Sequence, residues 1–149
     1  MKQYFCILIF TLPFLITACN STGEKNTKVE FKLAETEISD SLTEVTYNLT
    51  GEKYYLHSKI LLNENDISDA YAEVINSYPA IHMLLNNEGK LKLTELTANN
   101  IGKRIAVVIN GKFISAPIIR DTINTGKVLI SGDLTYEEAK KYVSRLGKE

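Results

Sequence analysis

Short stretches of the chain alternate between apolar and polar residues, which is the pattern of strands that bury one face. The first lies at residues 28–35, where Val29, Phe31 and Leu33 fall on one side. Later stretches are rich in aromatic and β-branched residues, which favour strands over helices. The sequence predicts strands at residues 28–35, 53–62, 80–86 and 127–132, and a weaker alternation predicts a further strand around residues 45–49.

Residues 67–78 follow the helical period instead, because their apolar positions recur every three or four residues. Asp66 can cap the start of this helix. Pro79 ends it, because proline lacks an amide donor and restricts the residue before it. The apolar face of the predicted helix consists of Ile67, Ala70, Tyr71, Val74 and Tyr78.

A second helix is predicted within residues 88–103. Leu93, Leu96 and Ile101 can share one face of it, and Gly102 suits its C-terminal cap.

The third predicted helix has the clearest start in the chain. Thr135 and Glu138 have the spacing of a capping box, and Leu134 is placed to pack against Ala139. Gly147 is expected to end the helix. Its apolar stripe consists of Ala139, Tyr142, Val143 and Leu146.

The stretch "VVINGKFISAPII" around Asn110-Gly111 predicts a β-hairpin. Asn-Gly favours positive φ at both positions, as a two-residue type I′ turn requires. With that turn, Val107 would oppose Ile114, and Val108 would oppose Phe113. Both faces of the hairpin are apolar, so each face should be covered by another part of the molecule.

Pro117 removes a donor from this hairpin, which fits an edge, a bulge or a bend. We therefore expect Ile118 and Ile119 beyond a change of direction. In one interpretation these residues only build the fold. In the other, the bend leaves an apolar groove or edge for a partner. The candidate partner-binding residues are then Phe113, Ile114, Pro117, Ile118 and Ile119.

Strands and helices in this order predict an α+β fold, with a mainly antiparallel sheet and helices packed on one of its faces. The predicted β-α-β-α-β-β order over residues 54–119 is compatible with a ferredoxin-like layout.

The composition and the spacing of the reactive side chains exclude several classes of function. The chain is 44% hydrophobic with a net charge of −1 and has no long basic run, so nucleic acid is not an expected partner. His57 and His82 lack metal-site spacing, and the glycines form no phosphate-binding loop. Glu137 and Glu138 lie in a first helical turn, where the helix dipole favours carboxylates. We expect no metal, no cofactor and no enzymatic activity.

The N-terminus resembles that of a bacterial lipoprotein precursor. Lys2 precedes the apolar run "YFCILIFTLPFLIT", which has the features of a secretory signal. The segment "ITAC", which ends at Cys19, resembles a lipobox. The resemblance implies cleavage after Ala18, a lipid on Cys19 and attachment to a membrane; Asn20 in place of aspartate favours the outer membrane. The expected organisation is a signal peptide at 1–18, the lipidated cysteine with a flexible tether at 19–27, and one domain at 28–149.

The stretch "LTELTANNIGKRIAVVINGKFISAPIIRDTINTGKVLISGDLTYEEAKKYV" closely resembles the head subdomain of the first periplasmic domain of SecD. SecD is a membrane component of bacterial protein export. The likeness covers residues 89–146 and extends more loosely back to residue 54. It departs at Asn110, where the family commonly has aspartate. The resemblance implies the head-subdomain fold and a surface that contacts polypeptide. Transport driven by protons depends on SecD's membrane-spanning part and is not expected of this chain.

The resulting functional hypothesis is an extracytoplasmic lipoprotein whose non-catalytic domain binds polypeptide and assists protein export or folding. The alternative is a dedicated inhibitor or immunity-type lipoprotein that binds one specific protein partner. The first predicts weak binding that tolerates many sequences, whereas the second predicts tight binding to a single protein.

Overall fold

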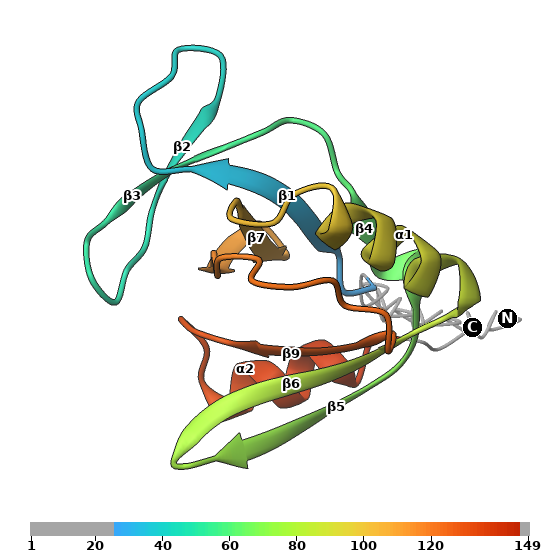
Figure 1. Cartoon of the computed structure of the whole chain (residues 1–149). Helices are drawn as coiled ribbons and strands as arrows, with labels where there is room; N and C mark the ends of the chain where they lie inside the picture. Colours follow the sequence, from blue (N-terminus) through green and yellow to red (C-terminus); the bar gives the residue numbers. More distant parts are fainter. Residues whose placement is uncertain (1–25, 147–149) are drawn as a thin grey trace, which may run out of the picture.

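The computed structural model describes residues 26–146 and shows two antiparallel sheets with two α-helices (Figure 1). The predicted α+β class, with mainly antiparallel strands, is confirmed. The larger sheet contains β1 (Val29–Glu35), β2 (Thr43–Thr46), β3 (Lys53–Leu56), β4 (Leu62–Asn63), β7 (Arg104–Ile109) and β8 (Lys112–Ser115). The smaller sheet contains β5 (Ile67–Ile75), β6 (Tyr78–Leu85) and β9 (Lys127–Ser131). The helices are the 3₁₀-helix η1 (Glu64–Asp66), α1 (Asn87–Ala98) and α2 (Tyr136–Val143).

Strand order puts β8 and β9 at sheet edges. The larger sheet runs β2-β3-β1-β7-β8, with β4 also paired to β1, and the smaller sheet runs β5-β6-β9. Within residues 26–146, each of β8 and β9 therefore has a strand partner on one side only.

The helix predicted over residues 67–78 is wrong, because this segment forms β5 and the start of β6. Asn76 and Ser77 have positive φ angles of 50° and 72° and form the two-residue turn between the strands. Ala70 and Ala72, two positions apart, pack against the core. The predicted β-α-β-α-β-β order over residues 54–119 therefore fails at its first helix.

The hairpin at Asn110-Gly111 is confirmed, with φ angles of 50° and 82° at its two turn residues. Val108 opposes Phe113 as predicted. Val107 opposes Ser115 rather than Ile114, because one extra residue on β8 forms a bulge and shifts the register.

The strand predicted at residues 53–62 is two strands. β3 pairs with the end of β1 at Ala34 and Glu35, and β4 pairs with its start at Glu30 and Phe31. Residues 57–61 bridge the interval without strand pairing. The weaker alternation around residue 45 corresponds to β2, which ends before the turn at residues 47–51.

Both remaining helices are confirmed. α1 starts at the cap Asn86 and ends at Asn99, so Ile101 and Gly102 lie beyond it and Ile101 is exposed. α2 has the predicted capping box at Thr135. The helix ends at Val143 with Ser144 as its C-cap, so the predicted end at Gly147 is wrong and Leu146 lies beyond the helix. The expected signal peptide and Cys19 lie outside the described residues.

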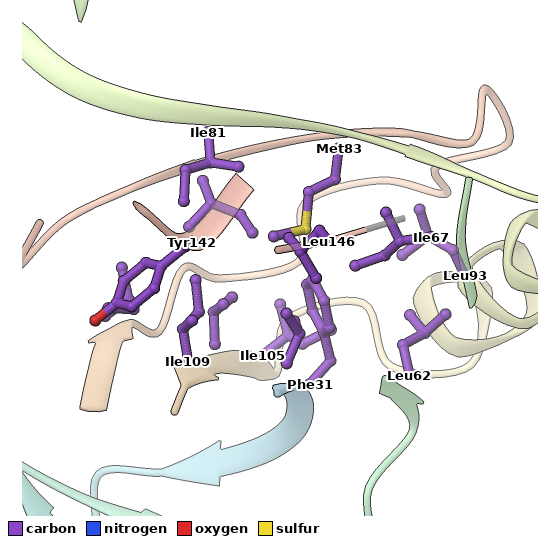
Figure 2. Packing of buried hydrophobic residues seen from close by; sticks show 14 of the residues in the cluster. Phe31, Leu62, Ile67, Ile81, Met83, Leu93, Ile105, Ile109, Tyr142 and Leu146 are labelled. Atoms are coloured by element: carbon purple, nitrogen blue, oxygen red, sulfur yellow. The ribbon is translucent and has the colours of Figure 1, made fainter. Parts of the chain in front are cut away.

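The main core fills the space between the two sheets. Figure 2 shows Ile81 and Met83 of β6 pointing toward Phe31 of β1 and Ile105 of β7. α2 packs against β5 and β6 on this inner face, and Tyr142 belongs to the same core. A second apolar cluster covers the other face of the larger sheet; its buried members are Ala34, Tyr54, Leu56, Ala106, Val108, Phe113 and Ala116.

Candidate functional site

A groove of about 410 Å³ lies where the edges of the two sheets diverge. One wall is formed by Ser115, Ala116, Pro117, Ile119 and Ile123, and the other wall is β9. Its floor reaches core residues of three different elements, including Phe31, Leu93 and Ile105, which Figure 2 labels. The volume falls within the range of about 300–1,000 Å³ that is typical of binding pockets.

The narrow end of the groove is fixed by Gly132, directly after β9. The Asp133 N–H donates to the Ile114 carbonyl over 2.9 Å, which joins β8 to the end of β9. A Cβ on Gly132 would lie 2.1 Å from the Ile114 carbonyl oxygen. Only glycine lets the two backbones approach this closely, and from this point the two edges separate.

The wall that contains Pro117 and Ile119 is held in place by hydrogen bonds to neighbouring segments of the chain. The Ile105 N–H donates to the Pro117 carbonyl (3.0 Å), and the Ile119 N–H donates to the Lys103 carbonyl (2.8 Å). The chain therefore stays beside residues 103–105 after Pro117, whereas the sequence predicted a change of direction there. Further along, the Ile123 N–H donates to the hydroxyl of Thr97 in α1 (2.9 Å).

The structure separates the five predicted contact residues into two groups. Phe113 and Ile114 are buried in the two apolar clusters. Pro117 and Ile119 line the groove, although Ile119 is only 5% exposed, and Ile118 is 40% exposed on the other side of the strand.

Two parts of the groove were not predicted from the sequence. They are the wall formed by β9 and the end formed by Tyr47 and Tyr54. Leu129 of β9 lines the groove and is 54% exposed, and its only sequence signal is an apolar residue on the polar face of an alternating strand. Tyr47 and Tyr54 line the groove next to the second cluster. Their rings pack edge-to-face, with centroids 6.5 Å apart, and Arg104 lies 5.6 Å from the centre of the Tyr54 ring.

The groove lining is nearly uncharged. Burial raises the pKa of Tyr47, and the carboxylates of Asp133 and Glu52 add to that effect. Burial likewise raises the pKa of Tyr54. Since a tyrosine ordinarily titrates near pH 10, both phenols are neutral at physiological pH. Lys127 is the one residue with a formal charge among those that line the groove in the described part of the chain.

The two histidines lie outside this groove. His57 is 3.2 Å from Glu35, and His82 stacks on Tyr71 with ring centres 4.5 Å apart. His82 Nε2 is 2.8 Å from Glu73 but lacks hydrogen-bond geometry to it. Within residues 26–146, no three His, Cys, Asp or Glu side chains are grouped as metal ligands, and no helix is long and apolar enough to cross a membrane.

Curated relatives of the chain are protein translocase subunits. SecD of Sebaldella termitidis is 38% identical over 98 residues, which is 65% of this chain and 24% of that protein. SecD of Rickettsia typhi is 39% identical over 93 residues, or 61% of this chain and 18% of that protein. The chain thus spans a quarter or less of the length of these relatives.

Solved structures agree with this relationship. The structure of a SecDF described as a membrane component that enhances protein export matches with a TM-score of 0.65 and 26% identity, over 82% of this chain and 62% of that one. A SecDF in a super-membrane-facing form matches with a TM-score of 0.64 and 26% identity, over 81% of this chain and 18% of that one.

The sequence profile of one family, "SecDF, P1 head subdomain", matches residues 38–147, which include both walls of the groove. The chain therefore belongs to the SecDF P1 head subdomain family.

Proposed function

We propose that this chain is a membrane-anchored extracytoplasmic lipoprotein whose head domain binds unfolded polypeptide in the groove and assists protein export. The main observation in support of this proposal is the groove, which is open, mostly apolar and almost free of charged residues. Unfolded chains expose apolar side chains, which such a surface removes from water without demanding a particular sequence.

The relatives support the export role. One related SecDF is described as enhancing protein export, and the family match over residues 38–147 includes both walls of the groove. The N-terminal resemblance to lipoproteins supports an anchor at Cys19, facing the periplasm and attached to the outer membrane.

Of the predicted contacts, Pro117 and Ile119 remain in the proposal as part of one wall of the groove, and Ile118 remains as the exposed residue between them. Leu129 joins them from the opposite wall. Phe113 and Ile114 act indirectly, since they are buried where they hold β8 in place.

The test is photo-crosslinking in cells from a probe that replaces Ile123, which lines the groove and is 38% exposed. The full chain carries either Leu129→Asp or the matched control Val74→Asp. Val74 is 50% exposed at the opposite edge of the same sheet. We expect adducts with many different exported precursors. Leu129→Asp should reduce them about tenfold, because a carboxylate in an apolar groove resists desolvation, and Val74→Asp should not.

Two results would contradict the proposal. Equal adduct yields from the Leu129→Asp and Val74→Asp chains would show that the groove does not bind polypeptide. One dominant adduct would favour the dedicated-partner alternative. Membrane fractionation of the Cys19→Ser chain in the same cells reports on the anchor separately.

A further inference from the structure

Both long sides of the groove are strand edges. On one side, the Leu85 N–H donates to the Gly126 carbonyl, at the start of the β6–β9 ladder. Hydrogen bonding in an antiparallel ladder alternates from residue to residue, so Val128 and Ile130 bond to β6. The main-chain groups of Leu129 therefore point away from β6, toward the free edge. Within residues 26–146, β9 pairs with no strand other than β6.

The other side has the same property at Ile118. Its neighbours Pro117 and Ile119 bond to residues 105 and 103, and Ile118 lies opposite Arg104 as a single bridge. By the same alternation, the N–H and C=O of Ile118 point away from residues 103–105. Unpaired strand edges of this kind are templates for a further strand.

We propose that the segment bound in the groove is an extended strand that pairs with the free edge of β9. This inference rests on the proposed function and specifies how the polypeptide is recognised. Main-chain hydrogen bonds are the same for every sequence, so strand addition explains how one groove accepts many exported chains. β9 has five residues, which corresponds to about 16 Å of bound strand at the usual rise per residue.

The groove also selects the side chains of that strand. Alternate residues of an added strand would point to the floor, where Phe31, Leu93 and Ile105 are buried or nearly so. The walls carry the positive charge of Lys127 and no carboxylate. The occupant is therefore a segment that alternates apolar with neutral polar residues and has neutral or acidic flanks.

Amide hydrogen exchange of the full chain in detergent micelles tests the pairing directly. The probe is an end-capped peptide of alternating valine and serine with a glutamate at each end. Its binding is measured separately by fluorescence anisotropy. At saturation, we expect the Leu129 amide to exchange at least about tenfold more slowly, because it gains a strand partner.

Two amides serve as internal controls. Val128 already bonds to β6, and Val74 lies on β5 at the opposite edge of the sheet, so neither should change. A matched peptide with lysine at each end should bind several-fold more weakly, because Lys127 repels it.

The possible failures are distinguishable. If the glutamate peptide binds and the Leu129 amide is unchanged, strand addition is wrong while groove binding stands. If the peptide binds equally well to the Leu129→Asp chain, or does not bind at all, the proposed function fails and this inference fails with it.

Discussion

Glu138 shows how one side chain connects three parts of the molecule. Its carboxylate accepts the Thr135 N–H over 2.8 Å at the start of α2, and it lies 2.9 Å from the Lys112 ammonium on β8. The Thr135 hydrogen bond, followed by Lys112, lowers the pKa of Glu138 below its ordinary value. Lys112 also lies 3.3 Å from Asp133, just after β9. Glu138 therefore helps to hold α2 against the narrow end of the groove.

Replacing Glu138 with glutamine should make stability depend less on pH. Because the folded-state pKa is lowered, the carboxylate stabilises the fold at pH values above the unfolded pKa of about 4.3, and the contribution is lost as pH falls through the folded pKa. Glu138→Gln should therefore cost about 1 kcal/mol at pH 7 and little at pH 3. Urea denaturation at both values checks this.

Glu137→Gln is the matched control for that prediction. Glu137 is in the same helical turn, is 81% exposed and forms a surface ion pair with Lys140. A surface ion pair contributes little, so this change should leave stability within about 0.5 kcal/mol at either pH. A pH-independent cost for Glu138→Gln would contradict the assignment.

At the same scale, the sequence predicts local interactions and misses distant ones. The Thr135–Glu138 box is visible because both partners lie within one helical turn. The contact with Lys112 spans 26 positions, and no local pattern records it. The bulge that displaces Ile114 was also missed; the Ile114 carbonyl there accepts the Asp133 N–H, a contact distant in the sequence that no local pattern records.

At the scale of elements, two hairpins have the same turn geometry and different turn sequences. Asn110-Gly111 and Asn76-Ser77 both have positive φ at each turn residue. Glycine adopts this conformation without a steric penalty, whereas for serine the left-handed conformation costs about 1 kcal/mol of free energy. The turn at Asn110-Gly111 could therefore be predicted from the sequence, whereas the turn at Asn76-Ser77 could not.

Exchanging the second turn residues should move stability in opposite directions. Ser77→Gly should stabilise the protein by about 0.5 kcal/mol, because removing strain outweighs the added freedom of the unfolded chain. Gly111→Ser should destabilise it by a similar amount. Thermal melting of both variants provides the measurement; a destabilising Ser77→Gly would contradict the turn assignment.

The error over residues 67–78 also has a physical cause at this scale. β5 carries exposed apolar residues, and β6 begins with another, so the helical spacing of Tyr71, Val74 and Tyr78 arises without a helix. These three side chains are 48% or more exposed, which is inconsistent with a buried helical stripe. Pro79 was read as a helix stop, but it lies near the start of β6.

At the scale of the whole molecule, the groove depends on how the two sheets meet. Its wall at Pro117 and Ile119 was predicted, because the sequence there is apolar and interrupted by proline. The opposite wall at Leu129 was not, because no local pattern shows that β9 lies across from that segment. The sequence predicted one sheet, and a groove between two sheets needs the second.

Gly132→Ala should separate the sheets where they meet. The added Cβ would clash with the Ile114 carbonyl at 2.1 Å, and φ is +149°. We expect a loss of more than about 2 kcal/mol in the free energy of unfolding. Gly51→Ala is the control: its φ is +76° with nothing within 4 Å, so it should cost about 1 kcal/mol. Equal losses in denaturant titrations would contradict the close approach.

The start of the described chain has a mechanical consequence. Thr27 is buried, and its hydroxyl donates to the Tyr142 carbonyl of α2 over 2.9 Å. Val29 then begins β1, which is paired with β7 from Val29 to Ala34. A pull on the N-terminus acts along β1, so the hydrogen bonds of this ladder share the load in shear and do not open one at a time. β9 lies in the other sheet, outside that line of force. A head held at its N-terminus could therefore bear tension while the edge of β9 kept its shape.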